Sequence, residues 1–449
     1  MADTTEESLV EQKKWEELRT LLITKPIPEV AEMLSALPKP ERVLAYHVLP
    51  PSQAWEVFSY LQPEIQDSLL TELTDHEARE LLAKLRPDDR TVLLEELPRQ
   101  TILRLQNLLS PRDLIEARKL LGYPEESVGR LMTPDFVSVL PDWTIEQAFQ
   151  HIRRKGREAE TISTIYVTDA QWKLLDALEL ERFVLASPSV TVESIMDHSF
   201  VALDPEEDRE EAVKKMRKYD LFALPVVDAS GVILGIVTAD DVFDVAVEEA
   251  TEDIHMGGAV EPLKMSYREA SPWGLYQKRI PWLVGLVVIN FGASGVIAFY
   301  EDMLASALAL AFFIPLLMAS GGNTGAQAAT LMVRALAIDD VKGTQWIKAL
   351  GKEVAVGSLL SLTMGIGVGV IGIVSSDWSI GLTVGLAMTA IVLVSNLIGV
   401  LCPVALNFVR VDPAVASSPM VTSIVDITSL LLYFAIASVI IGSGSTLVG

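Results

Sequence analysis

The second part of the chain alternates between long apolar runs and short polar segments. Uncharged runs cover residues 280–300, 303–333, 354–376, 378–409 and 413–449, the last interrupted only by Asp426. A helix that crosses a bilayer needs ~20 predominantly apolar residues, so each run is long enough to cross once. The pattern therefore predicts a transmembrane domain with five helices over residues 279–449.

A shorter period organises residues 26–122. Leucine recurs there every twelve residues, at Leu37, Leu49, Leu61, Leu73, Leu85, Leu97 and Leu109. Most of these leucines are followed within two residues by proline, which fits the first helical position because its missing N–H needs no partner there. Each unit is predicted to be a short helix that ends at a sharp corner, and such units bury their leucines only by stacking. We therefore predict an all-α superhelical N domain over residues 1–126.

A second repeat follows, with two copies that align over residues 131–154 and 195–218. Met132 matches Met196, and Pro141 matches Pro205. Each copy continues into a segment rich in β-branched and aliphatic residues, which gives the order helix–strand–strand–helix twice. The pattern predicts a pair of α/β modules, at 127–189 and 190–246.

An acidic connector, predicted to be a helix over residues 247–278, joins the second module to the first membrane span. Acidic residues recur at helical spacings in and just before it, at Asp240, Asp241, Asp244, Glu248, Glu249, Glu252 and Asp253. Like charges at this spacing repel, so the run is either a solvated face or a site for a divalent cation. The cation site is favoured because the run leads straight into the membrane domain.

The charge balance and the cysteine content exclude several classes of function. The chain has 36 basic and 60 acidic residues, and only eight of the acidic ones follow Arg279. No basic excess is available to neutralise phosphates, which argues against nucleic-acid binding. A single cysteine, Cys402, excludes a disulfide framework. The first residues contain no apolar h-region, so we expect the N domain to remain in the cytoplasm.

The loops between the apolar runs predict the orientation in the membrane. With a cytoplasmic N-terminus, all basic residues of the membrane domain lie in the inner flanks and loops, among them Arg279 and Arg410. The outer loops contain acidic residues and no basic one, in agreement with the positive-inside rule. We expect a multi-pass protein of the cell inner (plasma) membrane with its C-terminus outside.

Polar residues inside the apolar runs are the candidates for transport. Asp426 is the one carboxylate well inside a run, where a charge costs on the order of 3 kcal/mol. It is either an interfacial residue bonded to Thr422 or Ser423, or a cation site that faces a pore, and its position favours the pore. The segment GGNTGAQ at 321–327 permits tight helix packing or a direct contact with a ligand, and both interpretations stay open.

The membrane domain partly matches the residue patterns of two classes of intramembrane protease. The segment GASG at 292–295 has the form of an intramembrane serine protease motif, but the last histidine is His255, before the first span. An intramembrane aspartyl protease needs two facing carboxylates, and the spans offer one. The sequence therefore indicates that the protein is not an enzyme.

The order of these parts resembles the MgtE family of magnesium channels over essentially the whole chain. The most specific local matches are GGNTGAQ at 321–327 and VDPAVASSPMVTSIVDITSLL at 411–431. The resemblance implies a homodimer in the lipid bilayer, with one ion path between the subunits that the second and fifth membrane helices line. It implies a magnesium-selective influx channel that closes when Mg²⁺ binds its cytosolic domains.

The resemblance also implies roles for individual residues. Asp426 matches the pore aspartate of the family, while Ser418 stands in place of an asparagine and Thr422 where an alanine is known. Nine positions match the regulatory Mg²⁺ sites: Asp88, Asp89, Asp220, Asp241, Asp244, Glu249, Glu252, Asp253 and Asp412.

The paired α/β modules resemble cystathionine-β-synthase-type (CBS) modules, in which a Thr-x-x-Asp often binds a nucleotide ribose. The second module has Thr238 and Asp241 at these places, whereas the first has Glu179 and Arg182. The resemblance thus implies a nucleotide, ATP, as a ligand of the second module. Two alternatives remain: a transporter of another divalent metal or solute with a nucleotide-sensing CBS pair, and a membrane-tethered sensor without transport.

Overall fold

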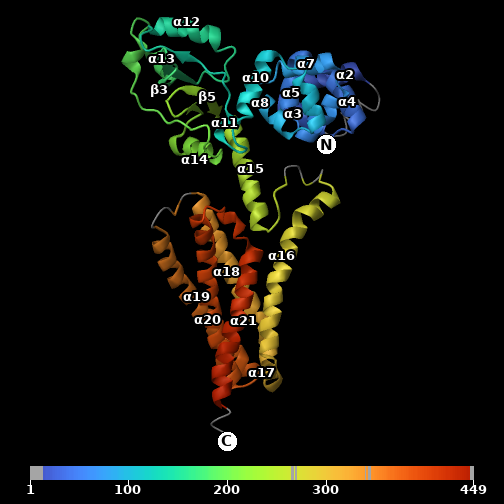
Figure 1. The fold of residues 1–449 in the computed structure, drawn as a ribbon, viewed down its shortest axis with the longest axis vertical. Helices are drawn as coiled ribbons and strands as arrows, with labels where there is room; N and C mark the ends of the chain where they lie inside the picture. Colours follow the sequence, from blue (N-terminus) through green and yellow to red (C-terminus); the bar gives the residue numbers. More distant parts are fainter. Residues whose placement is uncertain (1–13, 264–266, 268–269, 339, 342–344, 445–449) are drawn as a thin grey trace. The chain divides into compact units, whose positions relative to one another are not determined.

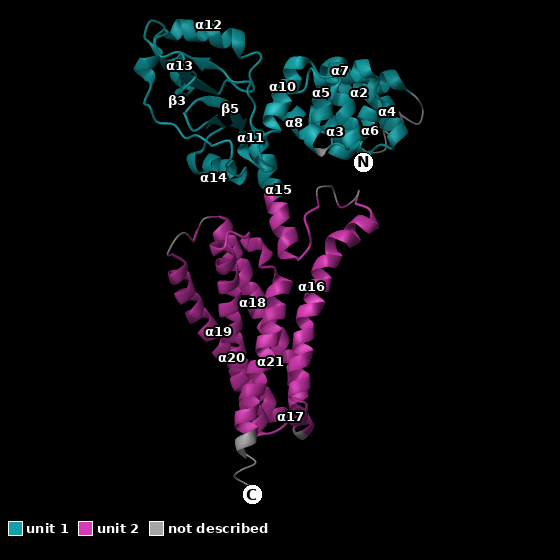
Figure 2. Cartoon of the chain, in the orientation of Figure 1, with its two compact units in different colours: residues 1–248 teal, residues 249–449 magenta. Residues whose placement is uncertain are grey.

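The computed structural model describes residues 14–263, 267, 270–338, 340–341 and 345–444. The chain divides into two compact units, residues 1–248 and residues 249–449, which Figure 2 shows in different colours.

The first part of unit 1 is a series of short helices (Figure 1). They are α2 (Trp15–Thr24), α3 (Ile27–Ala36), α4 (Lys39–Val48), α5 (Pro51–Ser59), α6 (Pro63–Glu72), α7 (Asp75–Leu82), α8 (Pro87–Glu96), α9 (Arg99–Gln106) and α10 (Pro111–Leu120). From α3 to α10 each helix begins twelve residues after the previous one. The structure therefore confirms the helical units that the leucine spacing predicts.

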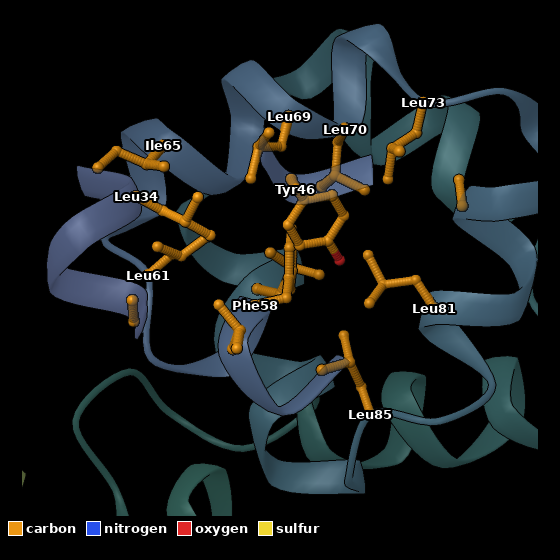
Figure 3. Close-up of a cluster of buried hydrophobic side chains, with 14 of the residues drawn as sticks. Leu34, Tyr46, Phe58, Leu61, Ile65, Leu69, Leu70, Leu73, Leu81 and Leu85 are labelled. Atoms are coloured by element: carbon orange, nitrogen blue, oxygen red, sulfur yellow. The ribbon is translucent and has the colours of Figure 1, made fainter. Parts of the chain in front are cut away.

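The leucines of this series lie at the helix ends and point into a common core. The first six, from Leu37 to Leu97, are between 4% and 7% exposed. Figure 3 shows side chains from several successive helices directed toward Tyr46 and Phe58, whose rings meet edge to face. The Tyr46 hydroxyl donates a hydrogen bond to the carbonyl oxygen of Ala54 at 3.1 Å, so the buried phenol is satisfied.

The rest of unit 1 has the helix–strand–strand–helix order twice, as predicted. The first module contains α11 (Val128–Leu131), β1 (Ser138–Val139), α12 (Ile145–Lys155), β2 (Thr164–Thr168), β3 (Leu174–Glu179) and α13 (Leu180–Leu185). The second contains η1 (Val192–Ile195), α14 (Glu210–Tyr219), β4 (Ala223–Val227), β5 (Ile233–Thr238) and the start of α15 (Ala239–Gly257). β1 is parallel to β2, whereas β2–β3 and β4–β5 are antiparallel.

α15 continues without a break from the second module into the connector. It begins at Ala239, directly after β5, and ends at Gly257. The next helix, α16 (Pro272–Phe299), begins fifteen residues later. Within the described residues, the predicted 247–278 connector is therefore not one continuous helix: it is helical up to Gly257 and again from Pro272, and non-helical between them.

Among the described residues of unit 2, five helices are long and apolar enough to cross a membrane, as predicted. They include α16, α18 (Ile314–Ala337), α19 (Gln345–Ser375), α20 (Trp378–Phe408) and α21 (Ser418–Gly444). Three short elements complete the unit: α17 (Glu301–Ser306), η2 (Leu308–Phe313) and η3 (Pro413–Val415). The second apolar run is broken at Ala307, whose φ of −137° and ψ of 70° end α17.

α20 packs against α18, α19 and α21, while α16 packs mainly against α21. Small residues allow the closest of these approaches. A Cβ on Gly399 of α20 would lie 2.2 Å from the carbonyl oxygen of Gly325 on α18. Tyr433 of α21 donates its hydroxyl to the carbonyl oxygen of Leu310 at 2.9 Å, which joins α21 to η2.

Candidate ion and regulatory sites

One face of α21 carries the three polar residues expected in the pore. Ser418, Thr422 and Asp426 are spaced by four, which places them on one side of the helix at intervals of about 6 Å. All three are half-buried within the isolated chain. Among the described residues, the Asp426 carboxylate has neither a hydrogen-bond nor an ion-pair partner.

The two neighbouring hydroxyl side chains make other contacts. Ser423 donates its hydroxyl to the carbonyl oxygen of Pro419 at 2.9 Å. Thr422 turns its methyl group toward α18, where a Cβ on Gly322 would lie 2.8 Å from it. Neither residue bonds Asp426, so the interpretation of Asp426 as an interfacial residue held by these hydroxyls receives no support.

The segment GGNTGAQ forms two different faces of α18. Gly321, Gly322 and Gly325 are buried against α20 and α21, where added side chains would collide with their neighbours. Asn323 and Gln327, four residues apart, lie together on an exposed face. The glycines therefore serve helix packing, while the two amides are available for another contact.

A cluster of carboxylates forms in unit 1 where α8 approaches α15. Asp88 and Asp89 lie in the first turn of α8, and Asp240, Asp241 and Asp244 lie in the first turns of α15. Asp88 is 5% exposed, and one of its carboxylate oxygens, Oδ1, has no hydrogen-bond partner. We call these five residues the acidic cluster.

The carboxylates of the acidic cluster repel one another. Burial raises the pKa of Asp88 to about 7, with the neighbouring Asp89 charge adding to the effect. Burial also raises the pKa of Asp241 to about 8, helped by the charge of Asp88 and opposed by a hydrogen bond from Thr238. The pKa of Asp89 and of Asp244 is raised as well, mainly by burial. A bound cation would relieve this repulsion.

The acidic cluster does not by itself enclose an ion. Among the described residues, no group of three or more His, Cys, Asp or Glu side chains has the arrangement of a metal site. Mg²⁺ often keeps several waters and contacts only one or two carboxylates directly. The chemistry of the cluster therefore fits a hydrated Mg²⁺ held through water better than a closed ligand cage.

The other predicted regulatory residues occupy different positions. Asp220 ends α14 in the left-handed conformation, with φ of 53°, and is exposed. Asp412 begins η3, where its carboxylate accepts a hydrogen bond from the Ala414 N–H at 2.8 Å. Glu249, Glu252 and Asp253 lie on the second half of α15. The acidic cluster thus contains only four of the nine residues that the sequence suggested.

The proposed ribose-binding residues contact each other. The Thr238 hydroxyl donates a hydrogen bond to the Asp241 carboxylate at 2.8 Å. Thr238 also lines a cavity of about 420 Å³, together with Arg86, Glu160, Thr161, Ser163, Phe222, Ala239 and Asp240. In the first module Glu179 stands at the N-cap position of α13 without a capping hydrogen bond from its side chain, and Arg182 pairs with Asp197 at 2.7 Å.

Comparison with known proteins identifies the family. A family model described as a divalent cation transporter matches residues 314–436, and the MgtE intracellular N domain matches residues 26–126. CBS domains match residues 128–184 and 192–248. The magnesium transporter MgtE of Thermus thermophilus is 37% identical over 405 residues, which cover 89% of this chain and 90% of that protein. The chain belongs to the MgtE family.

Two further MgtE relatives agree with this identification. The magnesium transporter MgtE of Enterococcus faecalis is 29% identical over 432 residues, covering 96% of this chain and 95% of that protein. The solved cytosolic domain of the Mg²⁺ channel MgtE in complex with ATP is similar with a TM-score of 0.51 at 34% identity. It covers 54% of this chain and 99% of that structure. The predicted family and the predicted fold class, including the CBS pair, are confirmed.

Two residues in or near the acidic cluster of this MgtE chain are not predicted as site residues from the sequence. Asp240 belongs to the acidic run, but nothing in the sequence pattern distinguishes it as a site residue from its neighbours. Arg86, the cation whose charge opposes the raised pKa values of Asp88 and Asp89, has no pattern that singles it out. The spacing of four between Ser418, Thr422 and Asp426 was available from the sequence and would have predicted their common face.

Proposed function

We propose that this protein is a transporter rather than an enzyme, and that it conducts Mg²⁺ into the cell as a channel. The observation that carries the proposal is the polar face of α21, where Ser418, Thr422 and a partnerless Asp426 follow one another along the helix. Mg²⁺ loses its waters reluctantly, so a row of hydroxyl and carboxylate oxygens suits a hydrated ion that passes from one turn to the next.

The polar faces also favour a homodimer with one path between the subunits. A polar group that faces lipid is costly, and polar residues in spans usually face a cavity or another helix. In the isolated chain Asn323 and Gln327 of α18 are exposed, and Asp426 of α21 is half-buried. A second copy packed against these faces would place two Asp426 carboxylates around one ion path.

We further propose that cytosolic Mg²⁺ closes the channel through the acidic cluster. An ion held between Asp88 or Asp89 on α8 and Asp241 or Asp244 on α15 would offset the burial of these carboxylates and the repulsion between them, which together raise their pKa values. Without the ion, repulsion would separate the two helices. The other expected Mg²⁺ contacts stay part of the proposal: Asp220, Glu249, Glu252, Asp253 and Asp412.

The proposal includes the cellular location of the protein and its orientation in the membrane. The N domain and the CBS pair lie in the cytoplasm, and the five spans lie in the plasma membrane with the C-terminus outside. ATP is proposed as a ligand of the cavity beside Thr238 and Asp241, because a relative's cytosolic domain was solved in complex with ATP. Adding ATP should protect these residues from hydrogen exchange.

The pore is tested by Mg²⁺ influx into liposomes that contain the purified protein. Asp426→Asn should abolish influx because it removes the charge without changing the size of the side chain. Thr428→Val is the matched control, since Thr428 lies on another side of α21 and donates its hydroxyl to the carbonyl of Ile424. Equal influx in the Asn variant and in the wild type would place the ion path elsewhere.

Closure is tested in the same liposomes by raising Mg²⁺ on the cytosolic side. A variant with Glu249, Glu252 and Asp253 replaced by Gln, Gln and Asn should conduct without inhibition by Mg²⁺. Unchanged inhibition would remove these residues from the closing mechanism while leaving the pore intact.

A second candidate is transport of a different divalent metal. Ser418 favours it, because a hydroxyl replaces the asparagine of the family pore and changes the contacts with the hydration shell. Competition of Co²⁺, Mn²⁺ and Ca²⁺ with Mg²⁺ influx distinguishes the two candidates. If Co²⁺, Mn²⁺ or Ca²⁺ crosses the membrane at a rate that added Mg²⁺ does not reduce, the second candidate is favoured.

A further inference from the structure

Helix α8 is joined to the first CBS module by an ion pair at each end. At its N-terminal end, the N-cap residue Arg86 pairs with Glu160, which lies just before β2. Near its C-terminal end, Glu95 pairs with Arg130 of α11 at 2.9 Å. We call these two ion pairs the α8 clamp.

The partners in the CBS module are held in place by their surroundings. The Glu160 side chain is 5% exposed, and its backbone N–H donates to the Asp135 carbonyl at 2.7 Å. The Arg130 side chain is 16% exposed and donates from Nε to the Tyr123 carbonyl at 2.8 Å. Breaking either pair would leave a largely buried charge without its partner, which is far costlier than losing an exposed pair.

The α8 clamp acts against the repulsion in the acidic cluster. The first turn of α8 carries Asp88 and Asp89, whose charges repel those of α15. The other cation of α8, Arg90, is 4% exposed and pairs within the N domain, with Asp113 at 3.1 Å and with Glu116. The two ion pairs of the clamp therefore supply direct charge–charge attraction across the α8–CBS contact.

We propose that Arg86, Glu95, Arg130 and Glu160 are positioning residues that set the Mg²⁺ concentration at which the acidic cluster closes. The proposal rests on the proposed regulation by Mg²⁺. The clamp holds α8 beside α15 and so contributes part of the free energy that Mg²⁺ would otherwise have to supply. A weaker clamp therefore requires more Mg²⁺ for the same degree of closure.

The test follows hydrogen exchange of residues 87–97 in the full-length protein while Mg²⁺ is titrated. Charge reversal in Arg86→Glu or in Glu160→Arg should raise the Mg²⁺ concentration for half-maximal protection by about fivefold or more. The double variant with both changes restores an ion pair of reversed polarity, and its midpoint should return to within about twofold of the wild type. Arg86→Gln serves as a milder variant if a reversal prevents folding.

Glu95→Arg, Arg130→Glu and their combination test the other end of the clamp in the same way. The matched control is Arg182→Glu, which breaks an exposed ion pair with Asp197 inside the CBS pair, away from α8. Its midpoint should equal that of the wild type.

The outcomes separate this inference from the proposed function. Single reversals that leave the midpoint unchanged, or a double variant that stays as weak as the singles, would overturn the clamp. Wild-type exchange that does not respond to Mg²⁺ would instead overturn regulation through the acidic cluster, and the Mg²⁺ role of the clamp with it.

Discussion

Replacing Asp88 by Asn should hold α8 more firmly in place when no metal is present. Asp88 is buried, lies beside the other carboxylates of the acidic cluster and has a carboxylate oxygen without a partner. Asn has nearly the same shape and no charge. The substitution therefore removes the repulsion that a cation would otherwise relieve, while keeping most of the packing.

The free-energy change caused by Asp88→Asn can be estimated from the raised pKa of Asp88. Burial and the Asp89 charge raise the pKa of Asp88 from 3.8 to about 7. At 1.36 kcal/mol per pKa unit, a charged Asp88 destabilises the docked state by about 4 kcal/mol. The Asn amide nitrogen would be buried without an acceptor, which costs ~2 kcal/mol. A net gain of ~2 kcal/mol remains, equivalent to about a thirtyfold smaller open population.

The effect depends on pH with a defined sign. A carboxyl pKa that is raised in the docked state costs nothing while the group is protonated in both states, below about pH 4. The cost grows as the pH rises from the ordinary carboxyl pKa of 3.8 toward the raised pKa of about 7, and is complete near pH 8. The difference between Asp88→Asn and the wild type should therefore be largest at pH 8 and much smaller at pH 5.

Hydrogen exchange of residues 87–97 in full-length protein with a chelator measures this difference. Comparison at equal pH cancels the intrinsic exchange rate, so slower exchange reports a smaller open population. Saturating Mg²⁺ should slow exchange in the wild type more than in the variant. Exchange that is faster in Asp88→Asn than in the wild type at pH 8 without metal would refute the electrostatic reasoning.

Three further substitutions test the packing and capping described above. Gly399→Ala places a Cβ against the Gly325 carbonyl and should lower the free energy of unfolding of the membrane unit by ~2 kcal/mol or more. Unchanged unfolding of the variant in detergent would contradict the close approach of the two helices. Thr74→Ala removes the capping box of α7 and should destabilise the N domain by ~1 kcal/mol in urea unfolding, with Thr74→Ser near wild type. Tyr433→Phe leaves the Leu310 carbonyl without its hydrogen-bond donor and should lower the free energy of unfolding by ~1 kcal/mol. An unchanged melting temperature would contradict this expectation.

The local elements could be predicted because hydrophobic periodicity is a property of neighbouring residues. The leucines from Leu37 to Leu97 mark helix ends, since each must turn toward the core at the same point of its unit. The repeat that pairs Met132 with Met196 predicts the same order of helices and strands twice. The five apolar runs predict five long helices, because only a helix satisfies all its backbone groups within lipid.

The membership of the acidic cluster could not be predicted in the same way. Charged residues on a solvated surface have no period that relates one helix to another. Asp88 and Asp241 are both acidic residues near a helix start, as many others are, and they meet because α8 is held against the CBS pair. Asp220 is an acidic residue of the same kind, yet it serves as the left-handed end of α14.

The sequence by itself determined the helices, the repeats, the family and the position of Asp426, because each depends on local hydrophobicity or on spacing along one element. Only the tertiary structure decided that Thr422 and Ser423 leave Asp426 without a hydrogen bond, and that Arg86 pairs with Glu160. The pairing of distant charges depends on how packed elements approach one another, and packing is set by the whole core rather than by any one segment.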